Sequence, residues 1–292
     1  MNRIKKSDLV LNNDGSIYHL NLKPGDVAKT IMLVGDPGRV GIIAKYFDKI
    51  ELEKQNREII TVTGLYKGKR LSVMSTGMGT DNIEIVVNEL DALFNIDLLT
   101  RYEKKEKTTL NLIRIGTSGA LQADIPVDNS FVVSEYGLGL DGLAYFYNNY
   151  ESNINSDLTN NFIKKMNWDN NYPRPYGVKA SDYLLEKVGH SWLKGITLTA
   201  PGFYAPQGRE LRLKVKDNTI IERARHFVYN DKKVTNFEME TSALYFLSTI
   251  LGHNALTVCD IIANRINDDF NPNYKESMEK LIEEILERLS KL

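Results

Sequence analysis

The chain of 292 residues is long enough for one large or two ordinary domains, and its 42% hydrophobic and 26% charged residues are ordinary proportions for a soluble globular protein. A formal net charge of -1 gives no overall field that would attract nucleic acid or an anionic membrane. The single cysteine, Cys259, excludes a disulfide within the chain and disfavours a cysteine zinc site. Because the N-terminus lacks the apolar core of a signal peptide and no stretch approaches a transmembrane span, we expect a cytoplasmic protein.

Strands and helices are predicted to alternate in the first half of the chain. The apolar run TIMLVG at residues 30–35 predicts a buried strand and a turn, followed by a helix from about Arg39 to Phe47. Residues 58–76 are typical of two strands joined by a YKGK hairpin turn. The other predicted elements here are a glycine loop at 77–82, a helix at 83–94, a solvated charged loop at 101–110, a strand at 111–116 capped by TSGA, and a strand at 130–136.

The second half continues in the same manner after an irregular region. Residues 148–180 are rich in Asn, Tyr and Pro, which predicts an irregular excursion around short helices. The later predicted elements are a strand at 195–200, the loop GFYAPQGRE at 202–210, a helix over 236–252 that starts with acids and ends at the C-cap Gly252, a strand at 255–263 and an amphipathic helix at 274–292.

This order of elements indicates an α/β fold. Strands that alternate with helices imply a mostly parallel sheet covered on both faces, and we expect one domain over residues 1–292. Ligands of such sheets bind at the carboxyl ends of the strands. Five segments are therefore predicted to meet at one rim: GDPGR at 35–39, GMGT at 77–80, GTSG at 116–119, the loop at 202–210 and DIIANR at 260–265.

Two of these segments suggest a phosphate site. GDPGR and GTSG each follow a predicted strand, and such loops can bind an anion through exposed backbone N–H groups. An arginine accompanies each segment, Arg39 after the first and Arg114 just before the second. Neither segment matches a P-loop or a GxGxxG pattern, which disfavours ATP and NAD.

Three acidic residues are candidates for the site. Glu238 and Glu240 are two residues apart at a predicted helix entry, where favourable charge at the helix N-terminus explains one of them. A carboxylate aimed into a pocket also suits a sugar diol, because it accepts two hydroxyl protons. Asp260 lies in an apolar run and needs a partner. A buried ion pair with Arg265 or Arg225 and an acid at the base of a pocket are equally good interpretations.

Five segments together carry a family resemblance: IMLVGDPGRV, RIGTSGA, FYAPQGR, NFEMETSAL and IIANR, in this order. The chain resembles the nucleoside phosphorylase-I family, and the uridine phosphorylases most closely. The resemblance implies a three-layer α/β/α sandwich with a twisted, partly barrel-like mixed sheet. It implies reversible cleavage of a nucleoside by inorganic phosphate, without metal or organic cofactor, in pyrimidine salvage. It also implies a homo-oligomer, a hexamer built from dimers with sites shared between subunits.

The resemblance assigns roles by position. The implied phosphate ligands are Gly35, Arg39, Arg57, Arg114 and Thr117, with Arg57 acting across a dimer interface. The implied ribose contacts are Thr117, Met239, Glu240 and His19, the last from a neighbouring subunit. The implied base contacts are Phe203, Gln207 and Arg209, braced by Arg265, with Asp260 nearby. The implied catalytic residues are Arg209, Gln207, Glu240 and Arg114. The departing uracil gains negative charge, which Arg209 and Gln207 can stabilise through pre-placed hydrogen bonds.

Three alternatives remain open at this point. Asp260 occupies a position where uridine phosphorylases often carry a small residue, and a purine nucleoside phosphorylase could use it as an acid. Gln207 and Arg209 favour uracil instead, although Ala205-Pro206 replaces a common glycine in the same loop. A hydrolytic nucleosidase shares the fold but gives the arginines no anion to bind, and a catalytically silent binding protein would not need the full set of polar residues.

Overall fold

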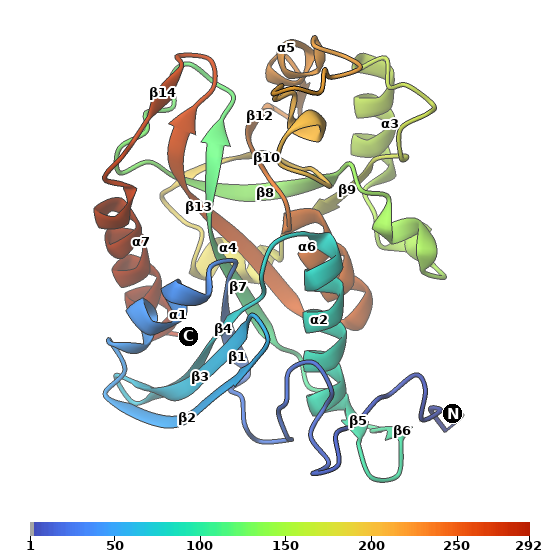
Figure 1. Ribbon diagram of the computed structural model, residues 1–292, viewed down its shortest axis with the longest axis vertical. Helices are drawn as coiled ribbons and strands as arrows, with labels where there is room; N and C mark the ends of the chain where they lie inside the picture. The colour runs from blue at the N-terminus through green and yellow to red at the C-terminus, as the bar shows by residue number, and fades with distance from the viewer. Residues whose placement is uncertain (1–2) are drawn as a thin grey trace.

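The computed structural model describes residues 3–292 and shows a large sheet flanked by helices (Figure 1). Within these residues the sheet has 12 strands; its main path is β11-β12-β10-β8-β13-β7-β1-β4-β3-β2, with β9 paired to β8 and β14 to β13. The strands are β1 (Thr30–Val34), β2 (Lys49–Asn56), β3 (Ile59–Tyr66), β4 (Lys69–Ser75), β7 (Asn111–Ala120), β8 (Phe131–Gly139), β9 (Tyr176–Lys179), β10 (Leu193–Thr199), β11 (Val228–Tyr229), β12 (Lys232–Glu238), β13 (Asn254–Asn264) and β14 (Asp269–Phe270).

Helices cover the sheet on both faces. The α-helices are α1 (Pro37–Ala44), α2 (Thr80–Asn95), α3 (Ser156–Lys165), α4 (Asp182–Lys187), α5 (Ile220–Arg225), α6 (Thr241–Leu251) and α7 (Tyr274–Leu289). Side chains alternate along β13, so Thr257 and Asp260 point to opposite faces. Thr257 bonds to Thr241 of α6 and Asp260 to Ser277 of α7, which places these helices on opposite faces. Figure 1 shows α2 beside α6 and α1 near α7.

The sheet is mixed and closes partly on itself. Strands β4, β1, β7 and β13 run parallel to their neighbours on this path, as do β8, β10 and β12, but β13 is antiparallel to β8 and the β2-β3-β4 meander is antiparallel. The mostly parallel sheet predicted from element order was therefore wrong, and the mixed sheet implied by the resemblance is confirmed. Strand β12 also pairs with β7 through Asn236↔Ala120 and Phe237↔Gly119, which closes β12-β10-β8-β13-β7 into a barrel-like ring.

The local predictions were correct for the buried strands and failed at several boundaries. TSGA is not a cap on a strand, because β7 continues to Ala120. Residues 236–238 belong to β12, and α6 starts only at Thr241, although it ends at the predicted C-cap Gly252 with φ 79°. The charged segment 101–110 contributes β6 (Tyr102–Glu103), which pairs with β5 (Ile96–Asp97). The edge strand β2 was missed.

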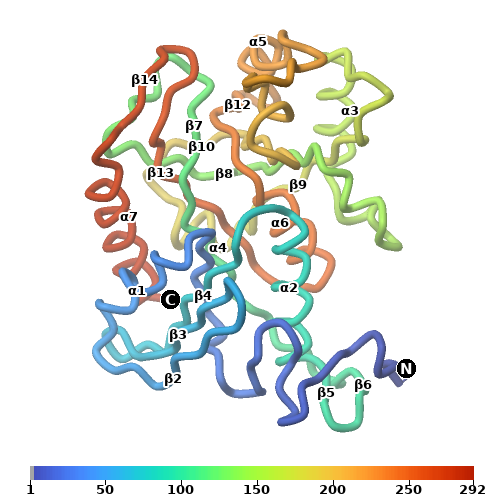
Figure 2. The backbone as a smooth tube through the Cα atoms, in the orientation of Figure 1, coloured from blue at the N-terminus to red at the C-terminus, as the bar shows by residue number. Residues whose placement is uncertain are grey.

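Two irregular regions border the sheet. The Asn- and Tyr-rich region contains the 3-10 helix η2 (Tyr150–Ser152), helix α3 and strand β9, as predicted in outline, and the 3-10 helix η1 (Leu143–Phe146) precedes it. The first residues of the described chain run past α2 and the β5–β6 hairpin, as Figure 2 shows. Backbone bonds fix this path, for example from Ile4 to the carbonyl of Arg101 at 2.9 Å.

Candidate functional site

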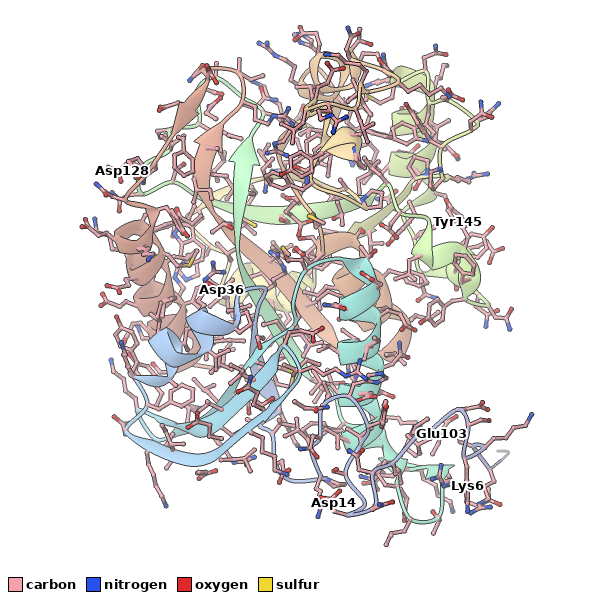
Figure 3. The ribbon with its side chains drawn as sticks, viewed as in Figure 1. Lys6, Asp14, Asp36, Glu103, Asp128 and Tyr145 are labelled. Atoms are coloured by element: carbon pink, nitrogen blue, oxygen red, sulfur yellow. The ribbon has the colours of Figure 1, made fainter. Side chains whose placement is uncertain are left out.

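A cavity of about 800 Å³ opens where β1, β7, β12 and β13 reach their carboxyl ends. Each of the five rim segments contributes to its wall, including Asp36, which Figure 3 labels at the start of α1. The predicted site residues that line the cavity are Gly35, Arg39, Arg114, Thr117, Phe203, Gln207, Arg209, Met239 and Glu240. Those that lie outside its wall are His19, Arg57, Asp260 and Arg265. The fold thus brings most of the predicted residues to one place.

One end of the cavity carries two buried arginines. Arg39 lies in the first turn of α1, whose N-cap Asp36 accepts the backbone N–H of Gly38 at 2.9 Å. Its Nη1 donates to the carbonyl of Ile115 at 3.0 Å. Burial lowers the pKa of Arg39, and the positive charge of Arg114 lowers it further. Because an anion between two buried cations relieves both effects, this end suits a phosphate group.

The GTSG segment does not form the anion-binding loop that the sequence suggested. Gly116 pairs with Cys259 of β13, and the pairing continues to Ala120 with one register shift, while Gly119 and Ala120 also pair with β12. Backbone donors committed to a sheet are not free to cradle an anion. Thr117 still lines the cavity, so side chains rather than a glycine loop supply the polar groups of this wall.

Arg114 is held between two buried carboxylates. Its Nη2 forms a close ion pair with Oε2 of Glu240, and its Nη1 lies 3.6 Å from Oε2 of Glu238. Burial would lower the pKa of Arg114, but the charges of Glu240 and then Glu238 outweigh it and raise this pKa. Burial also raises the pKa of Glu240, whose other oxygen accepts the N–H of Gly79 at 2.7 Å. The arrangement fixes the Glu240 carboxylate in the wall.

The two neighbouring acids have different roles. Glu238 accepts the backbone N–H groups of Glu240 and Thr241 at 2.9 Å each, and the hydroxyl of Thr199 at 2.6 Å. It therefore caps the start of α6, as expected from favourable charge at a helix N-terminus. Glu240 serves no such cap, and its position beside Met239 in the cavity wall agrees with an acid that contacts ligand hydroxyls.

The opposite end of the cavity combines an aromatic ring with an amide and a guanidinium. Gln207 ends the 3-10 helix η3 (Ala205–Gln207), and Gly208 follows with φ 66°, which turns the chain back toward the cavity. Nη1 of Arg209 donates to Oε1 of Gln207 at 2.5 Å and to the carbonyl of Phe203 at 2.8 Å. The guanidinium carbon also lies 4.0 Å from the centroid of the Phe203 ring. These three side chains form one rigid group.

Arg265 braces this group from outside the cavity wall. Its Nη1 donates closely to the carbonyl of Gln207, and its Nη2 donates to the carbonyl of Gly208 at 3.4 Å. The geometry matches the bracing position that the resemblance implied. Burial and then the charge of Arg265 lower the pKa of Arg209 to about 10, so Arg209 stays protonated at neutral pH.

His19 and Arg57 lie apart from the cavity but close to one another. Nδ1 of His19 lies 2.6 Å from Oε1 of Glu89, and its carbonyl accepts the side-chain amide of Asn56 at 2.8 Å. Arg57 is exposed at the β2–β3 turn, with its guanidinium 6.0 Å from the centroid of the Tyr18 ring. Both residues therefore sit at the surface of this subunit.

Asp260 belongs to β13, and its side chain is fully buried. Its Oδ1 accepts the hydroxyl of Ser277 at 2.7 Å, and Oδ2 has no hydrogen-bond partner within residues 3–292. Burial raises the pKa of Asp260 to about 6. The hydrogen bond from Ser277 and the charge of Arg39 lower this pKa, but by less than burial raises it. Of the two interpretations left open for Asp260, the ion pair with Arg265 or Arg225 is not formed within residues 3–292, and the carboxylate bonds to Ser277 of α7 and does not line the cavity.

The cavity also has lining residues that sequence reasoning missed. Glu58, Met78 and Asn82 extend the anion end, and Ile262 and Phe270 line the wall near β13 and β14. Met78 belongs to the GMGT segment that was placed on the rim, so its position could have been predicted. Phe270 comes from a short strand with no sequence signal of its own.

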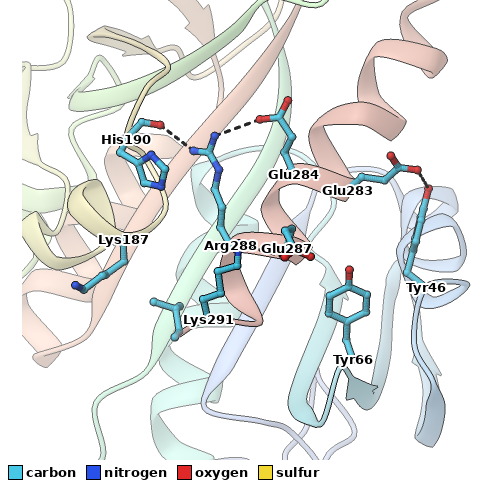
Figure 4. Close-up of a pocket in the computed structure, with 10 residues that line it drawn as sticks. Tyr46, Tyr66, Lys187, His190, Glu283, Glu284, Glu287, Arg288 and Lys291 are labelled. Carbon is cyan, nitrogen blue, oxygen red and sulfur yellow. Dashed lines mark hydrogen bonds and ion pairs between the residues drawn. The ribbon is translucent and has the colours of Figure 1, made fainter.

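A second hollow lies at the surface near α7 and has a volume of about 670 Å³ (Figure 4). Its charged groups are already paired: Tyr46 with Glu283 at 2.9 Å, and Arg288 with Glu284 and the carbonyl of His190. The predicted site residues lie elsewhere.

Among residues 3–292, no helix is both long and apolar enough to cross a membrane, and no three His, Cys, Asp or Glu side chains are grouped to hold a metal.

Comparisons with known proteins agree on one family. The family model described as the phosphorylase superfamily matches residues 29–291. A uridine phosphorylase of Thermococcus kodakarensis is 31% identical over 262 residues, covering 88% of this chain and 80% of that protein. A DeoD-type purine nucleoside phosphorylase of Listeria monocytogenes is 31% identical over 244 residues, covering 83% and 85%. The sequence similarity thus extends to relatives named for both pyrimidine and purine nucleosides.

Solved structures give the same result. A Trypanosoma brucei nucleoside phosphorylase, described as showing uridine phosphorylase activity, aligns with a TM-score of 0.87 at 29% identity and covers 98% of this chain and 100% of its own. A uridine phosphorylase of the oomycete Phytophthora capsici aligns with a TM-score of 0.70 at 21% identity, covering 100% and 99%, which supports the fold alone.

Proposed function

The chain belongs to the phosphorylase superfamily, and we propose that it is a pentosyltransferase that cleaves uridine with inorganic phosphate to give uracil and ribose 1-phosphate. The observation that carries this proposal is that one cavity is lined both by Arg39 and Arg114 and by the bonded pair Gln207 and Arg209. The first pair suits a phosphate and the second the edge of a uracil ring.

The residues that line the cavity support separate roles toward the phosphate, the ribose and the base. Phosphate carries about two negative charges near neutral pH, since its second pKa is about 6. A phosphate held by Arg39 and Arg114 would lie beneath the ribose. Glu240 would accept hydrogen bonds from the ribose hydroxyls. The glycosidic bond breaks through an oxocarbenium-like state, which the phosphate stabilises before it attacks the anomeric carbon. Arg209 and Gln207 stabilise the negative charge that develops on the departing uracil.

The two enzymatic alternatives receive less support from the structure. Asp260 would need to reach a purine in the cavity to protonate it, but its side chain is fully buried, bonds to Ser277 and does not line the cavity. A hydrolytic nucleosidase would give Arg39 no anionic ligand, although Arg114 is already paired with Glu240 and Glu238. The Nε of Arg114 has no hydrogen-bond partner within residues 3–292, which fits a site whose polar set is completed by an anionic ligand.

We further propose a homo-oligomer, a hexamer built as a trimer of dimers, in which each site borrows residues from a neighbour. His19 and Arg57 support this, because they lie at the surface outside their own subunit's cavity, where a second subunit could receive them. The proposed reaction uses phosphate as co-substrate and requires no metal or organic cofactor. A cytoplasmic location and a role in pyrimidine salvage stay predictions.

One experiment tests the function directly. The protein is incubated with uridine, thymidine, inosine or adenosine, each with and without phosphate, and release of the free base is followed. We expect phosphate-dependent release with uridine as the preferred ribonucleoside. Release of uracil at the same rate without phosphate would contradict phosphorolysis, and inosine turnover far above uridine turnover would contradict the pyrimidine assignment.

A further inference from the structure

A third and smaller cavity lies directly behind the turn that carries Gln207. This rear pocket has a volume of about 250 Å³, and the front of it is formed by Ala205 and Pro206 of η3. Gln207 of the same turn faces the main cavity. A single helical turn therefore separates the proposed base site from an apolar space on its other side.

The turn is closed by its own backbone hydrogen bonds. The N–H groups of Gln207 and Arg209 donate to the carbonyl of Tyr204 at 3.0 and 2.9 Å, and Gly208 donates to Ala205 at 2.9 Å. These bonds lie within residues 204–209, so the turn can move as one body without losing them. From outside, Arg265 holds its carbonyls through a long side chain that can follow a small displacement.

The far wall of the rear pocket is better anchored than the turn. It includes Trp168 and Tyr172 from the Asn- and Tyr-rich region, for which the sequence suggested no role. Nε1 of Trp168 donates to the carbonyl of Pro173 at 3.0 Å, and its ring packs 5.6 Å from that of Phe162. Lys216 pairs closely with Asp169 and so ties the outer edge of the pocket to the same region.

We propose that the rear pocket is a specificity-determining element of the base site: its free volume sets how far the turn at residues 204–209 can retreat, and hence how large a base the main cavity accepts. The inference rests on the proposed function. A purine has one more ring than uracil, and the Gln207 and Arg209 side chains line the main cavity. Retreat of the turn into an apolar space opens room there and replaces an empty volume by packed contacts.

Filling the rear pocket from its far side tests the proposal. Val215 is partly exposed and Leu140 is buried, both line the pocket, and neither contacts the main cavity. We would measure kcat/KM for uridine and for inosine in Val215→Phe and in Leu140→Phe, with Leu193→Phe at the half-exposed start of β10 as matched control. Thermal unfolding of each variant checks that it is folded. If Leu140→Phe does not fold, Val215→Phe alone tests the proposal.

We expect both pocket variants to keep uridine kcat/KM within about threefold and to lose inosine kcat/KM by at least about tenfold, about 1.4 kcal/mol of discrimination. The control should leave the ratio unchanged. The proposal is overturned if the folded pocket variants lower both substrates equally or change neither, or if the parent protein turns over uridine but not inosine. Absence of uridine turnover in the parent would instead refute the proposed function, so the two failures are distinguishable.

Discussion

Replacing Arg209 by alanine removes the positive charge at the base end of the cavity and leaves the anion end intact. The substitution deletes the bonds from Nη1 to Gln207 at 2.5 Å and to the carbonyl of Phe203 at 2.8 Å, and the stacking on the Phe203 ring. Loss of one pre-placed donor to a developing negative charge costs roughly 10²–10³ in kcat, or about 3–4 kcal/mol. We expect Arg209→Ala to lower uridine kcat by this factor.

The assay separates this effect from a general loss of the site. Steady-state kinetics on uridine would give kcat, and titration with inorganic phosphate would give the phosphate Kd. The Kd should change less than about twofold, because Arg39 and Arg114 lie at the other end of the cavity and do not bond to Arg209. Arg212→Ala is the matched control: Arg212 is exposed in the same loop and makes no hydrogen bond or ion pair within the described residues. Equal losses in kcat and phosphate affinity would refute the assigned role.

Three further predictions follow from the same contacts. Arg265→Met should lower uridine kcat/KM by about 10–100-fold through a displaced turn, with partial recovery in Arg265→Lys and an unchanged phosphate Kd; an unaffected kcat/KM would contradict bracing. Because burial raises the pKa of Asp260 to about 6, its deprotonation should reduce stability as pH rises from 5 to 7.5, and Asp260→Asn should abolish that part of the change; identical pH dependence of the urea midpoints would count against it. Co-expression of inactive Arg57→Ala and Arg209→Ala chains should restore activity if sites are shared between subunits, and no recovery in mixed oligomers would argue against sharing.

The sequence predicted best the strands that are buried on both faces. Residues 31–34 of β1 and 255–261 of β13 are apolar over most of their length and almost fully buried, so they stand out as continuous runs. Strand β2 escaped prediction because it lies at the edge of the sheet, where its KIELEKQN sequence exposes most side chains. TSGA was taken for a turn because glycine is rare inside strands. Here β7 pairs with three strands, β1, β12 and β13, and tertiary pairing overrides local preference.

The sequence predicted the place of some residues of the candidate site and not of others. The rim position of Arg39 and Gln207 was predictable, since each lies beyond the end of a strand in the sheet, whereas Arg114 lines the same cavity from within β7. Asp260 was not, because its face depends on the register of β13 and on the packing of α7 against it. The distinct roles of Glu238 and Glu240 also needed coordinates, because only the observed start of α6 shows which acid caps the helix.

The central position of β7 has a consequence for how the chain folds. Strand β7 at residues 111–120 is hydrogen-bonded to β1 at residues 30–34 on one side and to β13 at residues 254–264 on the other. During synthesis, one edge of β7 stays unpaired until almost the whole chain has emerged from the ribosome. Such long sequence separations slow folding and leave an unpaired strand edge that can aggregate with other chains. We therefore expect nascent or C-terminally truncated chains to depend on chaperones, and Arg114 to acquire its surroundings only at the last stage of folding.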